Sequence, residues 1–550
     1  MDSPLNVDGS VFSSSLLPTP AQSAQLLQLL RCNSLLTHSE SEELEAVIAS
    51  ALVDIARYDV EIGQSPGAMD RMVSERVVLQ EYVDKCRSAF SPVRRLPPEI
   101  LAHIFAFCSP DLIPLYEPQQ SLPLDPLART AQLHLLRLSR VCFGWREIVM
   151  GTPWLWTTIE GDFTDPLIIE RGIALLSQSL QRSARCSLAI HLAAWDDTPG
   201  LELLAQHSQR WQSADIFMYR MDAKFLSGIK GNLPLLEHLD LNLGRNEEIG
   251  PIDMFEFAPK LTRVALVAGG AVPRLPWSQL REVTLHSNFV DQDRVFVALA
   301  IMPQCSNECA FRLCGLDATE WILPIPEFGS VTSDIWSLDL TLKDESSSDH
   351  CREALGALLA RCTFPCFRSL RFRSRRQDPP LHWPRNDFAA FASRSSLRER
   401  LTTLHLHDMV ITEDEFIECL SEMHALSHLF MQDVPRWLAD DTDHVETDHV
   451  DTNHILITDS LLRRLTWTPD TARLGPHLAS LHVATLFTFD HHALLDLITS
   501  RIVSGSRDGP FEVGLEWMDR EPLIADSVLS RVRELQSQGK LRWRLECRTD

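Results

Sequence analysis

The sequence lacks the segments that place a protein in or across a membrane. No apolar run approaches the roughly 18–20 residues that a membrane-spanning helix needs. The first basic residue is Arg31, so no positive charge precedes an apolar run as it does in a secretory signal. We therefore expect no membrane partner, and we expect the protein to act in the cytoplasm, the nucleus or both.

The sequence also lacks the patterns of common catalytic and metal sites. It has no Gly-rich phosphate loop, no Gly-x-Ser-x-Gly elbow and no His-Glu-x-x-His pair. Its thirteen cysteines are scattered and never spaced Cys-x-x-Cys, which fits reduced thiols better than disulfides or a zinc site. We expect no cofactor, no metal and no enzymatic activity. An enzyme with an unrecognised site would need His, Asp and Ser side chains lining one pocket.

Positive charge is scarce relative to negative charge. The chain has 75 Asp and Glu residues against 51 Lys and Arg residues, a formal net charge of −24. This balance disfavours nonspecific binding to nucleic acids or anionic lipids, so we expect no nucleic-acid partner. The exception is the basic run 371–376, which contains Phe372. We interpret it as a solvated strand edge and turn; contact with RNA or an acidic substrate is the alternative.

Length and periodicity divide the chain. A sequence of 550 residues exceeds one core and indicates about two to four domains or an elongated repeat array. Residues 1–40 are predicted to be mostly disordered, with a helical turn at 24–30. Ser39, ahead of Glu42 and Glu43, resembles a capping box that would begin the next helix.

Residues 41–90 have the period of two helices. One apolar stripe recurs in alternating steps of four and three, as in a heptad seam: Leu44, Ile48, Ala51, Ile55, Tyr58 and Ile62. After a Gly/Pro turn, a second stripe follows: Met72, Leu79, Val83, Cys86 and Phe90. The two helices are predicted to fold back as an antiparallel hairpin, a short coiled coil. It packs on the next domain or, alternatively, dimerises.

Residues 92–159 contain the most informative motifs. The string Leu96-Pro97-Pro98-Glu99-Ile100-Leu101 begins a helix with one broad apolar face, and Pro98 suits its first turn. A Pro-rich stretch at 109–127 cannot be a helix interior. The helical pattern resumes at 129 and includes Leu138-Ser139-Arg140-Val141-Cys142-Phe143-Gly144-Trp145. It ends before Trp154-Leu155-Trp156.

This block resembles an F-box. Its motifs are most similar to those of F-box-like proteins abundant in mushroom-forming fungi. Three short helices bury too little surface to be stable alone, so a partner helix is expected to complete their core. The resemblance implies a three-helix module at 91–160 that binds a Skp-type adaptor and, through it, a cullin scaffold. The adaptor-binding residues carried over are Leu96, Pro97, Ile100, Leu101, Ile104, Phe105, Leu138, Val141, Cys142 and Trp145.

Those ten residues are not expected to act alike. We expect the Leu96–Pro97 corner and Ile100 to contact the adaptor, and Trp145 to hold the helices together. The insertion at 109–127 departs from the family pattern, because the typical domain joins these helices in a few residues. Two alternatives are open: the insertion leaves adaptor docking intact, or it shifts the position of docking.

Residues 161–550 repeat the pattern Leu-x-x-Leu-x-Leu. The last two apolar positions are typical of a short strand, and stretches such as 291–301, 352–361 and 413–423 suit helices between copies. Strand, turn and helix in repetition predict parallel strands on one side of an irregular leucine-rich-repeat solenoid. The copies are Leu236/Leu239/Leu241, Leu261/Val264/Leu266, Leu280/Val283/Leu285, Phe367/Leu370/Phe372, Leu401/Leu404/Leu406, Leu426/Leu429/Met431, Leu462/Leu465/Trp467 and Leu478/Leu481/Val483, with partial copies at Leu338/Leu340 and Trp211/Ala214/Ile216.

Three near-tandem pentads interrupt the repeats and contain His444, His449 and His454. We interpret residues 438–460 as an acidic solvated loop that grew by short duplication. Histidines with carboxylates can bind zinc, which is the alternative, but a spacing of five suits neither a helix face nor alternate strand positions.

The predicted fold is therefore mixed α/β: a helical hairpin, a three-helix F-box-like module, and an irregular leucine-rich-repeat solenoid. The resemblance implies a substrate-recruiting subunit of an SCF-type cullin-RING ubiquitin ligase, which acts by proximity on an unknown protein substrate. The alternative is a non-catalytic binding scaffold that uses the F-box and the repeats outside ubiquitin transfer.

Overall fold

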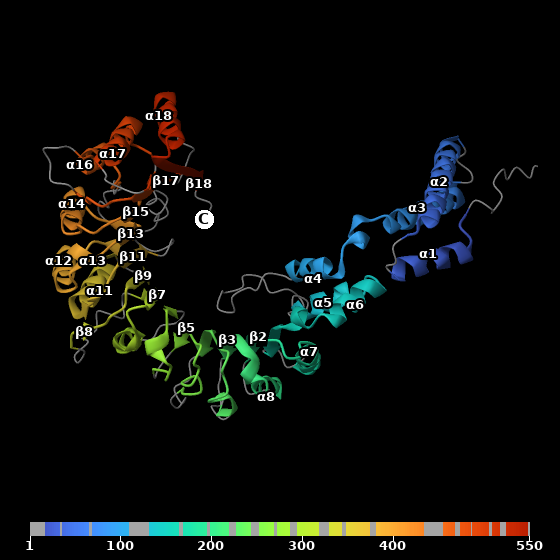
Figure 1. Cartoon of the computed structure of the whole chain (residues 1–550), viewed down its shortest axis with the longest axis horizontal. Helices are drawn as coiled ribbons and strands as arrows, with labels where there is room; N and C mark the ends of the chain where they lie inside the picture. Colours follow the sequence, from blue (N-terminus) through green and yellow to red (C-terminus); the bar gives the residue numbers. More distant parts are fainter. Residues whose placement is uncertain are drawn as a thin grey trace, which may run out of the picture. The chain divides into compact units, whose positions relative to one another are not determined.

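The chain divides into two structural units, Met1–His191 and Leu192–Asp550 (Figure 1). The predicted class is confirmed, because helices and one large parallel sheet make up a mixed α/β structure. The computed structural model describes residues 17–32, 36–64, 69–108, 131–163, 169–194, 199–218, 227–243, 252–268, 272–286, 294–317, 329–343, 348–374, 381–433, 455–467, 474–485, 487–504, 509–517 and 524–547.

The first unit begins with a complete helix, α1 (Pro20–Cys32), in a stretch predicted to be mostly disordered. Two local features explain it. The Thr19 and Gln22 side chains cap its first turn reciprocally, with N–H···O distances of 2.9 and 3.3 Å. Leu26 is buried, so the helix also gains apolar burial that the composition of the segment did not suggest.

Helices α2 (His38–Gln64) and α3 (Met69–Ala89) lie side by side (Figure 1). The capping box at the start of α2 joins Thr37 and Glu40, so the prediction based on Ser39 is wrong by two residues. The buried cluster between the helices contains members of both predicted stripes: Ala51, Ile55, Tyr58, Leu79 and Val83, with Ile48, Ile62 and Met72 packed against it. Dimerisation through these helices stays a prediction.

The predicted F-box-like segment is helical as expected. One detail differs from the sequence pattern, because the helix predicted from 129 is divided in two at 139–142. The insertion at 109–127 lies outside the described residues, so its effect on docking stays a prediction. The module ends in a strand and is followed by one more helix. Its elements are η1 (Pro92–Arg95), α4 (Pro98–Phe107), α5 (Ala131–Leu138), α6 (Phe143–Gly151), η3 (Pro153–Trp156) and β1 (Thr158–Phe163), followed by α7 (Ile169–Arg182).

The second unit alternates strands with helices or turns, and its strands from β3 to β18 follow chain order in one parallel sheet. Figure 1 shows helices α11, α12, α14 and α16 along one side of these strands. Strand β2 (Leu188–Ala194) crosses the boundary between the units. The strands of the sheet within the second unit are β3 (Trp211–Met218), β4 (His238–Leu243), β5 (Arg263–Ala268), β6 (Glu282–His286), β7 (Ala310–Asp317), β9 (Ser337–Lys343), β11 (Ser369–Ser374), β13 (Thr403–His407), β15 (His428–Gln432), β16 (Ser480–Thr485), β17 (Phe511–Trp517) and β18 (Leu541–Cys547).

Helices and short bridges complete the second unit. Two small parallel sheets pair β8 (Val331–Thr332) with β10 (Cys362–Thr363), and β12 (Leu381–His382) with β14 (Met409–Val410). The α-helices are α8 (Pro199–Ala205), α10 (Arg294–Ile301), α11 (Ser348–Arg361), α12 (Arg385–Arg394), α13 (Leu397–Arg400), α14 (Glu413–Ser421), α16 (Asp459–Leu465), α17 (His491–Ser504) and α18 (Asp526–Ser537); the 3-10 helices are η4 (Ser208–Arg210), η5 (Ser227–Ile229), η6 (Trp277–Gln279) and η7 (Met302–Gln304).

Two in-register ladders of apolar residues run across the sheet. Because alternate residues of a strand face the same side, residues two apart form two parallel rows. One row is Ala214, Leu239, Val264, Val283, Phe311, Leu338, Leu370, Leu404, Leu429, Leu481 and Val513; the other is Ile216, Leu241, Leu266, Leu285, Leu313, Leu340, Phe372, Leu406, Met431, Val483 and Leu515. All but Leu285 are buried, so these rows are the core of the unit. The parallel sheet is thereby confirmed, and the leucine-rich-repeat assignment stays a prediction.

Two predictions in this unit are wrong. The copy at Leu462 and Leu465 is not a strand but part of α16, which Thr458 caps by accepting a hydrogen bond from the Leu461 N–H at 3.2 Å. The run from Arg371 does not begin at a sheet edge, because β11 pairs with β9 on one side and β13 on the other. A leucine spacing of three fits a helix as well as the approach to a strand, and an edge cannot be recognised without the pairing.

Asp433, at the end of β15, links three segments and makes stability depend on pH. Its carboxylate accepts hydrogen bonds from the N–H groups of Leu456 and Ile457, at 2.8 and 3.2 Å, and from the Thr485 hydroxyl at 2.6 Å. Burial raises the pKa of Asp433 to about 6, above its usual value of 3.8. The folded chain therefore binds more protons than the unfolded chain between these values, and stability falls as pH rises through this window.

We expect the variant D433N to remove that pH dependence, because an amide of the same shape does not titrate. Relative to D433N, the wild-type chain should lose up to about 3 kcal/mol of unfolding free energy between pH 4 and pH 6. Urea unfolding of both proteins at pH 4, 5, 6 and 7 measures the difference. Parallel stability curves for the two proteins would contradict the prediction.

Candidate adaptor-binding site

The ten residues predicted to bind the adaptor lie in one module but not on one surface. Leu101 and Phe105 are buried in its core cluster, which also contains Ala102, Leu135, Val149, Leu155 and Trp156. Three more of the ten are partly buried and pack against the same cluster: Leu96, Leu138 and Trp145. The Trp145 ring lies 4.7 Å from that of Phe105, so its position suits the predicted role of holding the helices together.

The other predicted residues are more accessible. Ile100 is 47% exposed and Ile104 is 38% exposed, and both lie on the outer side of α4. Pro97 and Val141 are exposed as well. Cys142 has a structural role, because its sulfur accepts a hydrogen bond from the Trp145 N–H at 3.4 Å and caps α6. The module therefore buries one side of α4 and leaves apolar side chains on the other.

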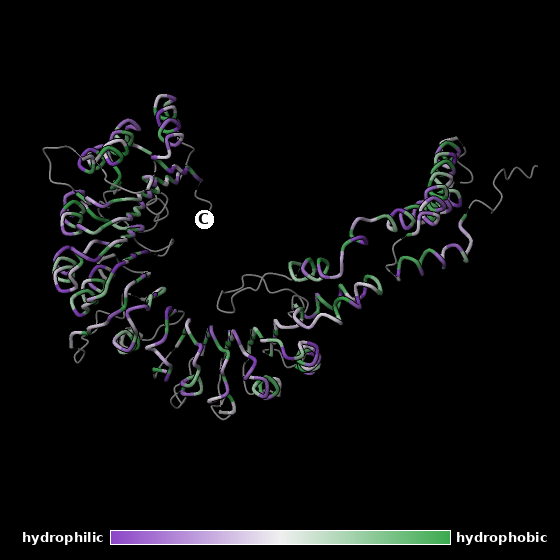
Figure 2. Tube along the Cα trace, viewed as in Figure 1, coloured by the Kyte–Doolittle hydropathy of each residue, from purple (hydrophilic) through white to green (hydrophobic). Residues whose placement is uncertain are grey.

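Three further exposed apolar residues extend this surface and were not predicted from the sequence. Phe107 is 89% exposed at the end of α4, and Phe143 and Trp154 are also exposed. The Trp154 ring lies 5.1 Å from the His103 ring. Helical spacing was the available signal for Phe107, which is three residues after Ile104. Figure 2 shows α4 as mostly hydrophobic along its length. Exposed apolar side chains gathered on one module mark an interaction surface.

An open groove of about 670 Å³ lies between α4 and the segment from α6 to η3. Its lining combines apolar and acidic side chains: Pro98, Glu99, Ala102, His103, Phe143, Gly144, Glu147, Ile148, Gly151, Thr152 and Trp154. Such a groove can receive apolar side chains from a partner helix, with polar groups at its rim.

A second groove, of about 810 Å³, lies between α1 and the turn from α5 to α6. The Arg94 side chain ties α1 to the module by donating to the Leu30 carbonyl at 2.7 Å. The groove brings exposed Leu27, Val141 and Phe143 beside basic side chains; its full lining is Ala24, Leu27, Gln28, Arg31, Ser139, Arg140, Val141, Cys142, Phe143 and Arg146. Helix α1 thus forms one wall beside two of the residues predicted to bind the adaptor.

Strand β1 fixes the C-terminal end of the module against helix α5. The Glu160 carboxylate accepts a hydrogen bond from the Ala131 N–H at 3.1 Å, and the Gln132 amide donates to the Glu160 carbonyl at 3.1 Å. Burial raises the pKa of the Glu160 carboxyl, although the Ala131 N–H and nearby His191 oppose the shift. These contacts hold the start of α5 against β1 and so position the predicted docking helices.

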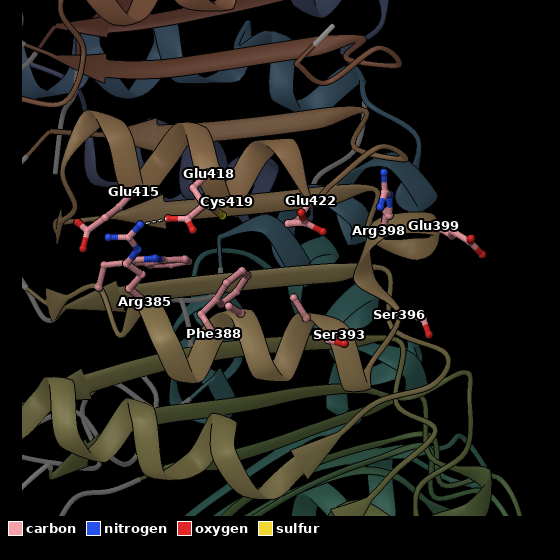
Figure 3. Close-up of a pocket in the computed structure, with 13 residues that line it drawn as sticks. Arg385, Phe388, Ser393, Ser396, Arg398, Glu399, Glu415, Glu418, Cys419 and Glu422 are labelled. Carbon is pink, nitrogen blue, oxygen red and sulfur yellow. Dashed lines mark ion pairs between the residues drawn. The ribbon is translucent and has the colours of Figure 1, made fainter. Parts of the chain in front are cut away.

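The second unit has a groove of about 440 Å³ between α12 and α14 (Figure 3). An ion pair crosses it, with 2.6 Å between Arg385 Nη2 and Glu418 Oε2. Burial raises the pKa of the Cys419 thiol, which keeps it protonated and unreactive. The described lining residues include neither histidine nor aspartate, so they do not supply the His, Asp and Ser cluster that an enzyme hypothesis requires.

Within the described residues, no group of His, Cys, Asp and Glu side chains has the geometry to hold a metal ion. The three histidines of the pentads, His444, His449 and His454, lie outside those residues, so their interpretation stays a prediction. Among the helices that the structure describes, none combines the length and apolar character needed to cross a bilayer.

Comparison with known families identifies the helical module. Residues 93–160 match the F-box-like family model, so this segment is an F-box-like domain and the predicted resemblance is confirmed there. Domains of this family generally bind Skp-type adaptors and are typically non-enzymatic. The match covers the three-helix core and the exposed apolar side of α4. A search of curated proteins finds no match to the chain.

Proposed function

We propose that the protein is a substrate-recruiting F-box subunit of an SCF-type cullin-RING ubiquitin ligase. The F-box-like domain binds a Skp-type adaptor and through it a cullin scaffold, while the second unit binds a protein substrate. The proposal also implies that the protein acts in the cytoplasm or the nucleus. Holding a substrate near a ubiquitin-loaded enzyme raises the effective concentration of both, so the chain needs no catalytic residue of its own.

The observation that carries this proposal is the exposed apolar side of α4. A small module that matches the F-box-like family leaves Ile100, Ile104 and Phe107 accessible, although its inner face is fully packed. Covering water-exposed isoleucine and phenylalanine side chains with a partner lowers the free energy, which favours binding. The F-box-like family supplies the identity of that partner, a Skp-type adaptor.

Co-purification of the full chain with a Skp-type adaptor and a cullin tests the proposal. We expect both proteins to be recovered with the wild-type chain at stoichiometric levels, because the adaptor bridges the other two. Recovery of the adaptor without the cullin supports the alternative, a binding scaffold that acts outside ubiquitin transfer. Recovery of neither protein would falsify both forms of the proposal.

A further inference from the structure

The face of the parallel sheet opposite the apolar ladders carries a row of charged and ring side chains. Each member lies between the two ladder positions of its strand and therefore faces the other way. Consecutive members are paired in register across neighbouring strands from β7 to β17: Arg312, Asp339, Arg371, His405, Phe430, His482 and Gly514. The row joins segments that are far apart in the sequence into one continuous surface.

Three guanidinium groups converge on a single carboxylate in this row. Asp339 Oδ2 lies 3.5 Å from Arg312 Nε, 3.4 Å from Arg371 Nη1 and 2.7 Å from Arg373 Nη2. Arg312 also pairs with Glu282, at 3.3 Å. Within the part of the chain that the structure describes, three arginines thus share two carboxylates. The arginine cluster, Arg312, Arg371 and Arg373, keeps an excess of positive charge in a chain that is acidic as a whole.

Asp339 holds the arginine cluster in place, but the guanidinium groups remain partly accessible to a partner. The three arginine side chains are between about a third and two fifths exposed, whereas Asp339 is buried beneath them. Burial is the main cause that lowers the pKa of Arg371, and the neighbouring Arg373 and Arg312 add to it while Asp339 opposes it. An additional carboxylate from a partner would relieve this repulsion, and guanidinium N–H groups match carboxylates in paired hydrogen bonds.

A stack of rings continues the row beside the arginine cluster. The rings of His405 and Phe430 are 3.8 Å apart and nearly parallel, and those of Phe430 and His482 are 4.5 Å apart. Burial and the nearby Arg371 lower the pKa of His405 to about 3, so this ring is uncharged at neutral pH. Gly514 makes room for His482, because a Cβ there would lie 2.2 Å from His482 Nδ1.

We propose that this row binds an acidic, extended segment of a partner polypeptide. A carboxylate side chain of the segment pairs with Arg371 and Arg373, and an adjacent apolar side chain covers the partly exposed rings of Phe430 and His482. His405 is itself buried and supports the stack from within the fold. The argument is charge complementarity: a local excess of guanidinium groups lies directly beside an uncharged ring surface. The alternative interpretation of the basic run, contact with an acidic substrate, is thereby preferred to RNA, which the net charge disfavours.

This inference rests on the proposed function only in naming the segment as part of the recruited substrate. Binding itself is measured without adaptor or cullin. A failure here would therefore leave the F-box-like assignment in place, and a failure of adaptor co-purification would leave the peptide site in place.

The probe is a fluorescein-labelled peptide with four glutamates around one phenylalanine, titrated with the full chain and followed by fluorescence polarisation. We expect saturable binding that weakens when salt is raised from 50 to 500 mM, because exposed charge pairs are screened. The variant carrying Arg371→Gln and Arg373→Gln should bind at least tenfold more weakly. Phe430→Leu, which keeps the arginine cluster, should weaken binding severalfold.

Arg542→Gln is the matched control, since Arg542 also lies on the sheet and pairs with Glu512 at 2.7 Å, away from the cluster. We expect its affinity to stay within twofold of wild type, and unfolding midpoints should show that every variant is folded. Three results overturn the proposal: no binding at 1 mM protein, equal affinity for the peptide with glutamine in place of glutamate, or tighter binding of a labelled twelve-nucleotide RNA.

Discussion

Replacing Ile100 and Ile104 together with glutamate is expected to weaken adaptor binding at least a hundredfold while the F-box-like domain stays folded. Both side chains lie on the accessible side of α4. Covering a fully exposed isoleucine contributes roughly 1.5–3 kcal/mol; because these two are 47% and 38% exposed, covering both contributes about 1.3–2.6 kcal/mol. The introduced charges supply the rest of the roughly 2.8 kcal/mol that a hundredfold change requires. A buried carboxylate without a partner adds a further penalty. Isothermal titration of the purified chain with a Skp-type adaptor measures the change.

The matched control is the pair Val53→Glu and Val60→Glu on α2. These valines are 62% and 58% exposed, lie outside the matched segment, and receive the same two charges. Their affinity for the adaptor should equal that of the wild-type chain. Substituting Leu96 is a poorer test, because Leu96 packs against the core cluster and its loss also destabilises the module. Unchanged affinity in the isoleucine double variant would contradict the placement of the adaptor on α4.

Replacing Trp156 with alanine is expected to unfold the F-box-like domain. Trp156 is 1% exposed, its Nε1–H donates to the Val149 carbonyl at 2.8 Å, and the Arg182 guanidinium lies 4.5 Å from its ring. Removing a buried tryptophan costs about 3–5 kcal/mol, and an unpaired carbonyl adds about 1 kcal/mol. That total approaches the whole stability of a small domain, which is about 5 kcal/mol at the lower end.

Limited proteolysis combined with mass spectrometry distinguishes this domain from the rest of the chain. In the Trp156→Ala protein, cleavage within residues 131–160 should become rapid, while the second unit keeps its resistance. Trp154→Ala is the control, since Trp154 is two residues away and 40% exposed. It should keep wild-type resistance and yet lose adaptor affinity. Equal resistance of the Trp156→Ala protein would show that the ring does not stabilise the module.

Much of the second unit followed from alternation along short strands. Pairs such as Leu239 and Leu241 lie two residues apart, and only a strand places such pairs on one buried face. The same reasoning missed β7, where Phe311 and Leu313 show the alternation but no upstream leucine precedes it. It also assigned Leu465 to a strand, because leucine spacing alone does not distinguish a short capped helix from the approach to a strand.

The candidate sites were less accessible to prediction because they depend on relations between distant residues. A family pattern selects Leu101 and Ile100 together, although Leu101 is buried and its neighbour Ile100 is exposed; burial separates them only in the folded domain. The arginine cluster requires the register between β7, β9 and β11, which brings Asp339 beside Arg371. No local pattern contains that register, so the basic run was interpreted without its carboxylate.

The order of the strands has a consequence for how such a chain can change over evolutionary time. In the large sheet, each strand from β3 to β18 pairs with the members of that sheet that precede and follow it in the chain. The connections contribute only the short pairs β8–β10 and β12–β14. The link from Gln432 to Ser480 is much longer than the link from Ala268 to Glu282, yet both end on the same ladders. Recombination can therefore lengthen one link without changing the order of the strands, whereas removing a strand breaks its ladders with both neighbours, which must then pair with each other. A lineage can diversify the segments between the strands in this way while inheriting one unchanged F-box-like domain.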